Sequence, residues 1–168
     1  MNQHKLAIVP GSFDPMTLGH LELIRKAAAQ YREVVVAVMV NREKQTMFDM
    51  GTRVKIAEAT VRDLPNVRVI ADSGMLIDLF DRLGADAVCK GYRNERDLAY
   101  ERLQDDWNRA HNPHFRTELF RSEGAFAALS STEVRERLAN GEPITSLVSA
   151  SALPIILDKI KNDSNSCS

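Results

Sequence analysis

The sequence PGSFDPMTLGH, at residues 10–20, decides the fold of this chain. The apolar run Leu6–Val9 precedes it and predicts a buried strand, and apolar residues at helical spacing follow it. Thr17 is a typical N-cap residue, so His20 falls at the third position of the predicted helix. Free N–H groups at a helix N-terminus attract phosphate, and a histidine there can donate to an oxygen that gains charge. We therefore predict a phosphate site at this strand–loop–helix junction, although the stretch matches neither GxGxxG nor GxxxxGK[ST].

The composition excludes several classes of protein. The chain has 168 residues, a formal net charge of −1, 44% hydrophobic residues and 27% charged residues, which is typical of a globular domain. It lacks the overall basic charge that favours nucleic acid, and no apolar run approaches the ~18 residues of a membrane span. Its two cysteines suggest no disulfide framework and no metal site, as in a reducing compartment. We predict a cytoplasmic protein without nucleic-acid or membrane partners, with one domain over 1–160 and a flexible polar tail over 161–168.

Short apolar runs alternate with amphipathic helical patterns along the chain. The runs predict strands over 6–9, 34–40, 67–71, 87–89 and 118–120. The patterns predict helices over 18–31, 52–63, 76–83, 94–110 and 134–139. Val- and Ile-rich strands separated by helices indicate an α/β fold, here a Rossmann-like, doubly wound, five-stranded parallel sheet with helices on both faces. Such sheets bind ligands beyond the carboxyl ends of their strands, where the strand order reverses, usually between the first and fourth strands.

Two further segments carry groups that bind phosphate. KGYR, at residues 90–93, follows the fourth predicted strand with a glycine for close backbone approach and two cations. Ser130, Ser131 and Thr132 precede the late helix, where Ser130 and Glu133 fit a capping box. A solvated turn and simple helix capping are the alternative interpretations of these segments. We predict that both converge with residues 11–20 on one polyphosphate.

These motifs resemble those of the nucleotidylyltransferase superfamily and, within it, the phosphopantetheine adenylyltransferase family. The resemblance covers about residues 1–158. Besides residues 10–20, 90–93 and 130–132, it rests on Lys44 before Met47-Phe48, on Tyr100-Glu101 and on Asn108-Arg109. It implies transfer of AMP from ATP to 4′-phosphopantetheine, which gives dephospho-coenzyme A and pyrophosphate in coenzyme A biosynthesis. It also implies a homohexamer, and the chemistry of such a transfer implies a magnesium ion that bridges the phosphates of ATP with few protein ligands.

The resemblance also implies the roles of individual residues. His20, Lys44 and Arg93 would be catalytic. The nucleotide would contact Gly11, Ser12, Phe13, His20, Gly91, Tyr92, Arg93, Glu101, Phe126, Ser130, Ser131 and Thr132. The phosphopantetheine would contact Ser12, Lys44, Leu76 and Lys90.

The chain departs from the family pattern at three places. Ser12 stands where Thr is usual, and Lys90 stands where Arg is common, so the charge is kept without the two-pronged grip. Asp105-Asp106-Trp107 occupies a helix segment that is usually more apolar. Two alternatives stay open: a sister enzyme such as a nicotinate-mononucleotide adenylyltransferase, which usually has His where Thr17 stands, and a nucleotide-binding protein without turnover.

Overall fold

The central strands form where the sequence places continuous runs of Val, Ile and Ala, because strands buried on both faces exclude polar side chains. The computed structural model describes residues 5–166. Its strands are β1 (Leu6–Gly11), β2 (Glu33–Met39), β3 (Val67–Asp72), β4 (Ala87–Tyr92) and β5 (Thr117–Arg121). Its helices are α1 (Leu18–Gln30), α2 (Met50–Val61), α3 (Leu76–Leu83), α4 (Glu95–His111), α5 (Ser131–Ala139) and α6 (Leu153–Ser166), with a 3₁₀ turn, η1 (Gly124–Ala127).

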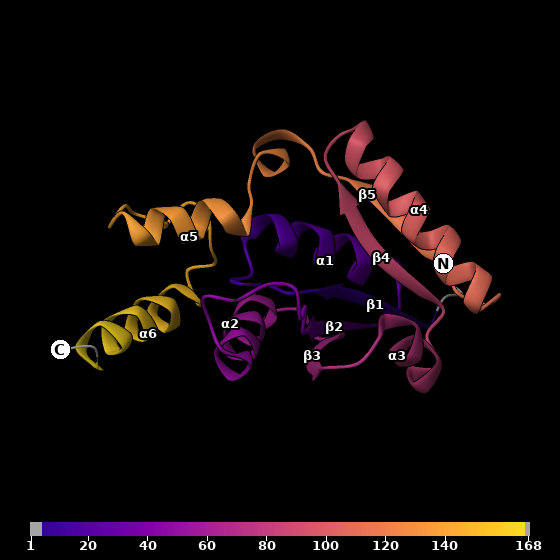
Figure 1. Cartoon of the computed structure of the whole chain (residues 1–168), viewed down its shortest axis with the longest axis horizontal. Helices are drawn as coiled ribbons and strands as arrows, with labels where there is room; N and C mark the ends of the chain where they lie inside the picture. The colour runs from indigo at the N-terminus through magenta and orange to yellow at the C-terminus, as the bar shows by residue number, and fades with distance from the viewer. Residues whose placement is uncertain (1–4, 167–168) are drawn as a thin grey trace.

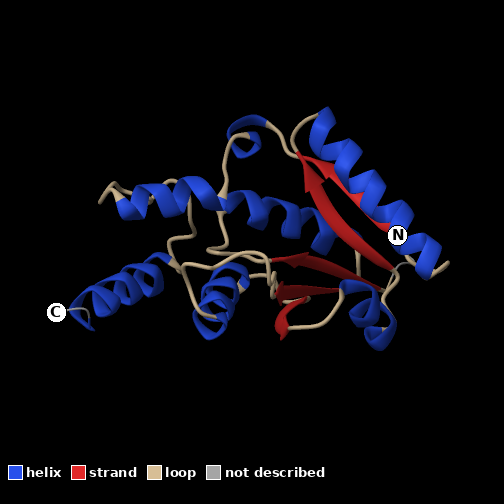
Figure 2. Cartoon of the chain, in the orientation of Figure 1, coloured by secondary structure: helices blue, strands red, loops and turns tan. Residues whose placement is uncertain are grey.

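All five strands lie parallel in the order β3-β2-β1-β4-β5, which confirms the predicted doubly wound sheet (Figures 1 and 2). The order reverses between β1 and β4, as predicted. β1 pairs with β2 along its whole length but with β4 only through Ala7 opposite Ala87 and Ile8 opposite Val88. β4 and β5 therefore diverge from β1 toward their carboxyl ends, as Figure 2 shows. Residues at the carboxyl ends of β1 and β4, among them Gly11 and Gly91, line a crevice at this switch point.

Alternate residues of the sheet pack into two cores. Val9 and Val36 belong to the core beneath α1, α2 and α6, whereas Ile8 and Ala37 face α3 on the opposite side. This arrangement confirms helices on both faces. Cys89 is fully buried in the larger core, where burial, the chief cause, raises the pKa of its thiol to about 12. The thiol is therefore a neutral packing group.

Two predicted boundaries and one predicted capping motif need correction. β4 continues to Tyr92, so Lys90 and Gly91 end a strand rather than start a loop. α5 begins at Ser131 instead of Val134, because Ser130 is its N-cap. Glu133 donates its N–H to Ser130 Oγ, but its carboxylate pairs with Arg137 at 3.0 Å, so only half of the predicted capping box forms.

The sequence analysis missed η1 and the last helix, α6. Ile156 of α6 is completely buried, and α6 packs against α2. Residues 161–166, expected to belong to a flexible tail, form the last turns of this helix, and residues 167–168 lie outside the described part of the chain. Over the described residues, none of the helices is both long enough and apolar enough to cross a bilayer.

Candidate active site

The crevice between β1 and β4 holds a cleft of about 390 Å³. It brings together the three segments that the sequence predicted to converge. Of the predicted nucleotide-binding residues, its lining includes Gly11, Phe13, His20, Gly91, Arg93, Glu101, Phe126, Ser130 and Ser131, and it also includes Lys90. The convergence is a finding of the structure, whereas the role of each residue stays a prediction.

His20 is held at the first turn of α1 by a reciprocal capping box. Thr17 is the N-cap, its hydroxyl accepts the N–H of His20, and Nδ1 of His20 accepts the N–H of Thr17 at 3.0 Å. A backbone N–H can only donate, so Nδ1 is the acceptor and the proton of the neutral ring lies on Nε2. Desolvation lowers the pKa of His20 to about 4, so the ring is neutral at pH 7. The site thus offers a fixed Nε2–H donor.

The ring of Phe13 packs against the imidazole of His20. The backbone of Phe13 has a φ of 48°, which is in the left-handed region and costs a residue with a side chain about 1–2 kcal/mol. This backbone conformation places the Phe13 ring in a buried position, where it contacts His20 edge-on with 5.0 Å between the ring centroids. Gly11 makes room for this ring, because a Cβ at Gly11 would lie 2.9 Å from its Cζ. The small-residue loop therefore fixes both the tautomer and the position of His20.

We expect the low pKa of His20 to show in the pH dependence of stability. Between pH 6.5 and about 4, the unfolded chain binds a proton at His20 that the folded chain does not bind. This group therefore lowers stability as the pH falls through that window and has no effect above it. In urea unfolding, the free energy of unfolding should depend less steeply on pH for His20→Gln than for the wild type. In the folded wild type, the NMR chemical shifts of the His20 ring should be those of a neutral imidazole at pH 5. An imidazole midpoint near 6.5 would contradict this.

A second, more polar cavity of about 280 Å³ adjoins His20 on the side of residues 40–49, which we call the Lys44 loop. Its lining includes Ser12, His20, Lys44, Ser131 and Thr132. Lys44 is exposed and lies in a turn in which its N–H donates to the carbonyl of Asn41 at 3.0 Å. A lysine from this loop and a histidine from α1 therefore face one polar space.

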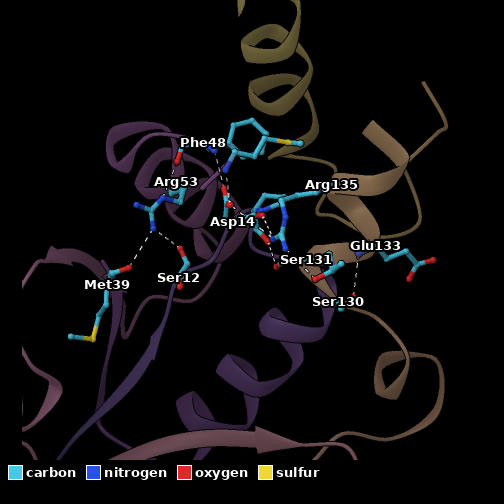
Figure 3. Close-up of polar contacts among 12 residues, drawn as sticks. Ser12, Asp14, Met39, Phe48, Arg53, Ser130, Ser131, Glu133 and Arg135 are labelled. Atoms are coloured by element: carbon cyan, nitrogen blue, oxygen red, sulfur yellow. Dashed lines mark hydrogen bonds and ion pairs between the residues drawn. The ribbon is translucent and has the colours of Figure 1, made fainter. Parts of the chain in front are cut away.

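The predicted hydroxyl segment lies at the start of α5, against the first loop (Figure 3). Ser131 Oγ donates to the carbonyl of Pro15 at 2.8 Å, and Thr132 Oγ1 accepts from Arg135 at 3.1 Å. Helix capping therefore uses Ser130 alone. The other two hydroxyls join α5 to the first loop and to Arg135.

Each cation of the segment at residues 90–93 has a carboxylate partner on α4. Lys90 Nζ lies 3.0 Å from Glu101 Oε2, and both side chains are largely buried, at 22% and 18% exposure. Arg93 Nε lies 2.9 Å from Asp97 Oδ2, and the pKa of Asp97 is lowered chiefly by its hydrogen bond to Arg93. Glu101 thus brings a negative charge to the cleft, and Lys90 balances that charge.

Two further cavities continue from Lys90 toward α3 and α4. One, of about 220 Å³, is lined by Ser12, Val40, Leu76 and others; the next, of about 380 Å³, by Leu76, Gln104, Trp107 and others. Lys90 lines both. The four residues predicted for the acceptor thus divide between this side and the Lys44 cavity. Trp107, from the segment that departs from the family pattern, lines the larger one.

Sequence reasoning missed some of the lining residues. Tyr92, the last residue of β4, is not among the lining residues of these four cavities, and its predicted contact with the nucleotide stays a prediction. Asp97 and Ser122 line the main cleft, and Asp14 and Arg135 line the Lys44 cavity. The sequence offered a signal only for Asp97, an acidic residue in the first turn of the predicted helix and four positions after Arg93.

A cleft at the switch point of a parallel sheet, with a capping histidine at its base, is the arrangement of a nucleotidylyltransferase. The Cytidylyltransferase-like family model matches residues 8–137. The phosphopantetheine adenylyltransferase of Lachnoclostridium phytofermentans is 37% identical over 92% of this chain and 95% of its own length. That of Syntrophomonas wolfei is 36% identical over 95% and 99%. This chain therefore belongs to the phosphopantetheine adenylyltransferase family.

A solved structure supports the fold independently. The crystal structure of a candidate nicotinate-nucleotide adenylyltransferase from Vibrio parahaemolyticus aligns with a TM-score of 0.72 and covers 94% of both chains. The two sequences are 18% identical, so this likeness concerns the fold alone.

Proposed function

We propose that this chain transfers the adenylyl group of ATP to 4′-phosphopantetheine and releases dephospho-coenzyme A and pyrophosphate. Membership of the family supports this reaction, since its relatives match over nearly their whole length. The observation that carries the assignment to particular residues is the position of His20, which lines both the main cleft and the Lys44 cavity. A group bound in either space reaches the same imidazole.

The reaction needs neutralised charge and alignment more than it needs a protein nucleophile. An oxygen of the acceptor phosphate attacks the α-phosphorus of ATP, and the bond from that phosphorus to the oxygen of the leaving pyrophosphate breaks. His20 Nε2–H donates to an oxygen of the α-phosphate as its charge grows, and Lys44 approaches from the opposite side. Arg93 and the N-terminus of α5, with Ser130, Ser131 and Thr132, hold the outer phosphates.

The remaining predicted residues bind the two substrates. Gly11, Phe13, Gly91, Tyr92 and Phe126 contact the nucleotide, and Lys90 with Ser12 holds the acceptor phosphate. Leu76 lines the path of the pantetheine arm, which suits the two cavities between Lys90 and α4.

The family resemblance supports finer proposals about magnesium, assembly and location. In the described part of the chain, no three His, Cys, Asp or Glu side chains are grouped to hold a metal. A magnesium ion would therefore be held mainly by phosphate oxygens and water, and it would neutralise charge on the pyrophosphate. We further propose a cytoplasmic homohexamer.

A pyrophosphate-release assay tests the proposed function. ATP and CTP are each combined with 4′-phosphopantetheine, nicotinate mononucleotide or no acceptor, with and without magnesium. We expect turnover with ATP, 4′-phosphopantetheine and magnesium together. Turnover with nicotinate mononucleotide instead would assign a sister activity, and nucleotide binding without turnover in any combination would refute an enzymatic role.

A further inference from the structure

Asp14 lies where three segments around the Lys44 cavity meet (Figure 3). Its carboxylate accepts hydrogen bonds from the backbone N–H groups of Met47, at 2.8 Å, and Phe48, at 2.9 Å. Its carbonyl oxygen accepts a hydrogen bond from Nη1 of Arg135, at 2.8 Å. One residue of the first loop therefore holds the end of the Lys44 loop and also contacts α5.

The carboxylate of Asp14 is buried, since the residue is only 5% exposed. A buried carboxylate is costly unless its oxygens are satisfied, and here each oxygen accepts one backbone N–H. The following helix, α2, does not require these bonds, since Asp49 caps it by accepting the N–H of Thr52 at 2.8 Å. Asp14 therefore fixes the loop end rather than the helix.

Arg53 secures the same junction from α2. It is 4% exposed, and its guanidinium donates to the carbonyls of Phe48, at 3.1 Å, and Ser12, at 2.9 Å. A longer contact of 3.4 Å reaches the carbonyl of Met39, at the end of β2. The first loop and the far end of the Lys44 loop are thus joined by two buried side chains of opposite charge.

Lys44 itself has no comparable anchor. Within the described residues, the hydrogen bonds of positions 41–45 stay inside the loop, where Asn41 accepts from the N–H groups of Glu43 and Lys44. The position of the Lys44 ammonium relative to His20 therefore depends on where the chain is fixed three residues later, at Met47.

We propose that Asp14 is a positioning residue, which holds the Lys44 loop so that Lys44 reaches the reacting phosphates on the side opposite His20. This inference rests on the function proposed above. Asparagine at position 14 offers one oxygen in place of two and turns its NH₂ group toward a backbone N–H. The loop end would then lose one of its two bonds, and Lys44 would lose its fixed reach.

The test is a double-mutant cycle of Asp14→Asn and Lys44→Ala, measured by pyrophosphate release. Misplacement of a reacting group by about 1 Å costs about 10²-fold, so we expect Asp14→Asn to lower kcat by about that factor with the KM for ATP little changed. Because Asp14 acts through Lys44, the double variant should be no slower than Lys44→Ala alone. Multiplied losses would overturn the inference, as would an unchanged kcat for folded Asp14→Asn.

Two further variants separate positioning from stability. Asp49→Asn alters a carboxylate at the same loop end that does not contact the first loop, and it should keep the wild-type kcat. Insertion of one glycine between Lys44 and Gln45, in the exposed part of the loop, leaves the contacts of Asp14 in place but breaks their link to Lys44. It should reproduce the kcat loss even if Asp14→Asn does not fold, and a wild-type kcat would overturn the inference. Absence of turnover in the wild type would instead refute the proposed function, and the inference with it.

Discussion

Replacing His20 with alanine is expected to lower kcat by about 10²–10³-fold, the usual effect of removing one well-placed donor to a developing oxyanion. The ring is neutral at pH 7 because desolvation lowers its pKa to about 4, and Thr17 fixes its proton on Nε2. Alanine removes this donor and also the acceptor for the N–H of Thr17. Loss of one capping bond costs about 1 kcal/mol, so the melting temperature should fall by only about 2–4 °C.

The matched control for this variant is His114→Ala. His114 is exposed, in the loop between α4 and β5, and its side chain lines none of the four cavities described above. Its removal should leave kcat and the melting temperature unchanged. Steady-state pyrophosphate release and differential scanning calorimetry measure the two effects separately. A His20→Ala enzyme that keeps wild-type kcat would remove His20 from the catalytic set.

The fold could be predicted because its strands leave few alternatives. β2 is buried from Val34 to Val38, and a continuous apolar run that is rich in Val and too short for a helix indicates a strand covered on both faces. β4 was predicted too short because Lys90 and Gly91 resemble a turn; they remain in the strand because β5 pairs with them. α6 was missed although Pro154, near its start, is a helix-start signal, because its second half is polar.

The site was predictable where its chemistry is local in sequence. His20 and Ser130 were found because an N-cap and the residues after it can be recognised within a few positions. Asp14 was missed because its partner Met47 is 33 residues away, and no local pattern indicates that contact. Arg53 did carry a signal: it lies on the same helix face as buried Ile56 and Ala57, so a buried guanidinium with backbone partners was a reasonable expectation.

The second large loss of activity is expected when the ion pair between Lys90 and Glu101 is broken. We expect Lys90→Met to lower kcat/KM for 4′-phosphopantetheine by about 10²-fold, as is typical when one partner of a largely buried charge pair is removed. Two causes act together. The acceptor phosphate loses its cation, and Glu101, 3.0 Å from Lys90 in the wild type, is left as an unbalanced negative charge in a cleft that must accept a polyphosphate. Steady-state kinetics with varied acceptor measures the loss.

A second substitution separates these two causes. Glu101→Gln in the Lys90→Met background removes the unbalanced charge but does not restore the cation, so it should recover part of the lost kcat/KM. Arg68→Met is the control, since Arg68 pairs with Glu33 at 2.6 Å but both side chains are about half exposed, at 51% and 47%, and lie away from the cleft. Its kcat/KM should match the wild type. If the second substitution recovers nothing, Lys90 acts only as a phosphate ligand; if Lys90→Met itself retains wild-type kcat/KM, the acceptor phosphate binds elsewhere and the cation of β4 serves only to balance Glu101.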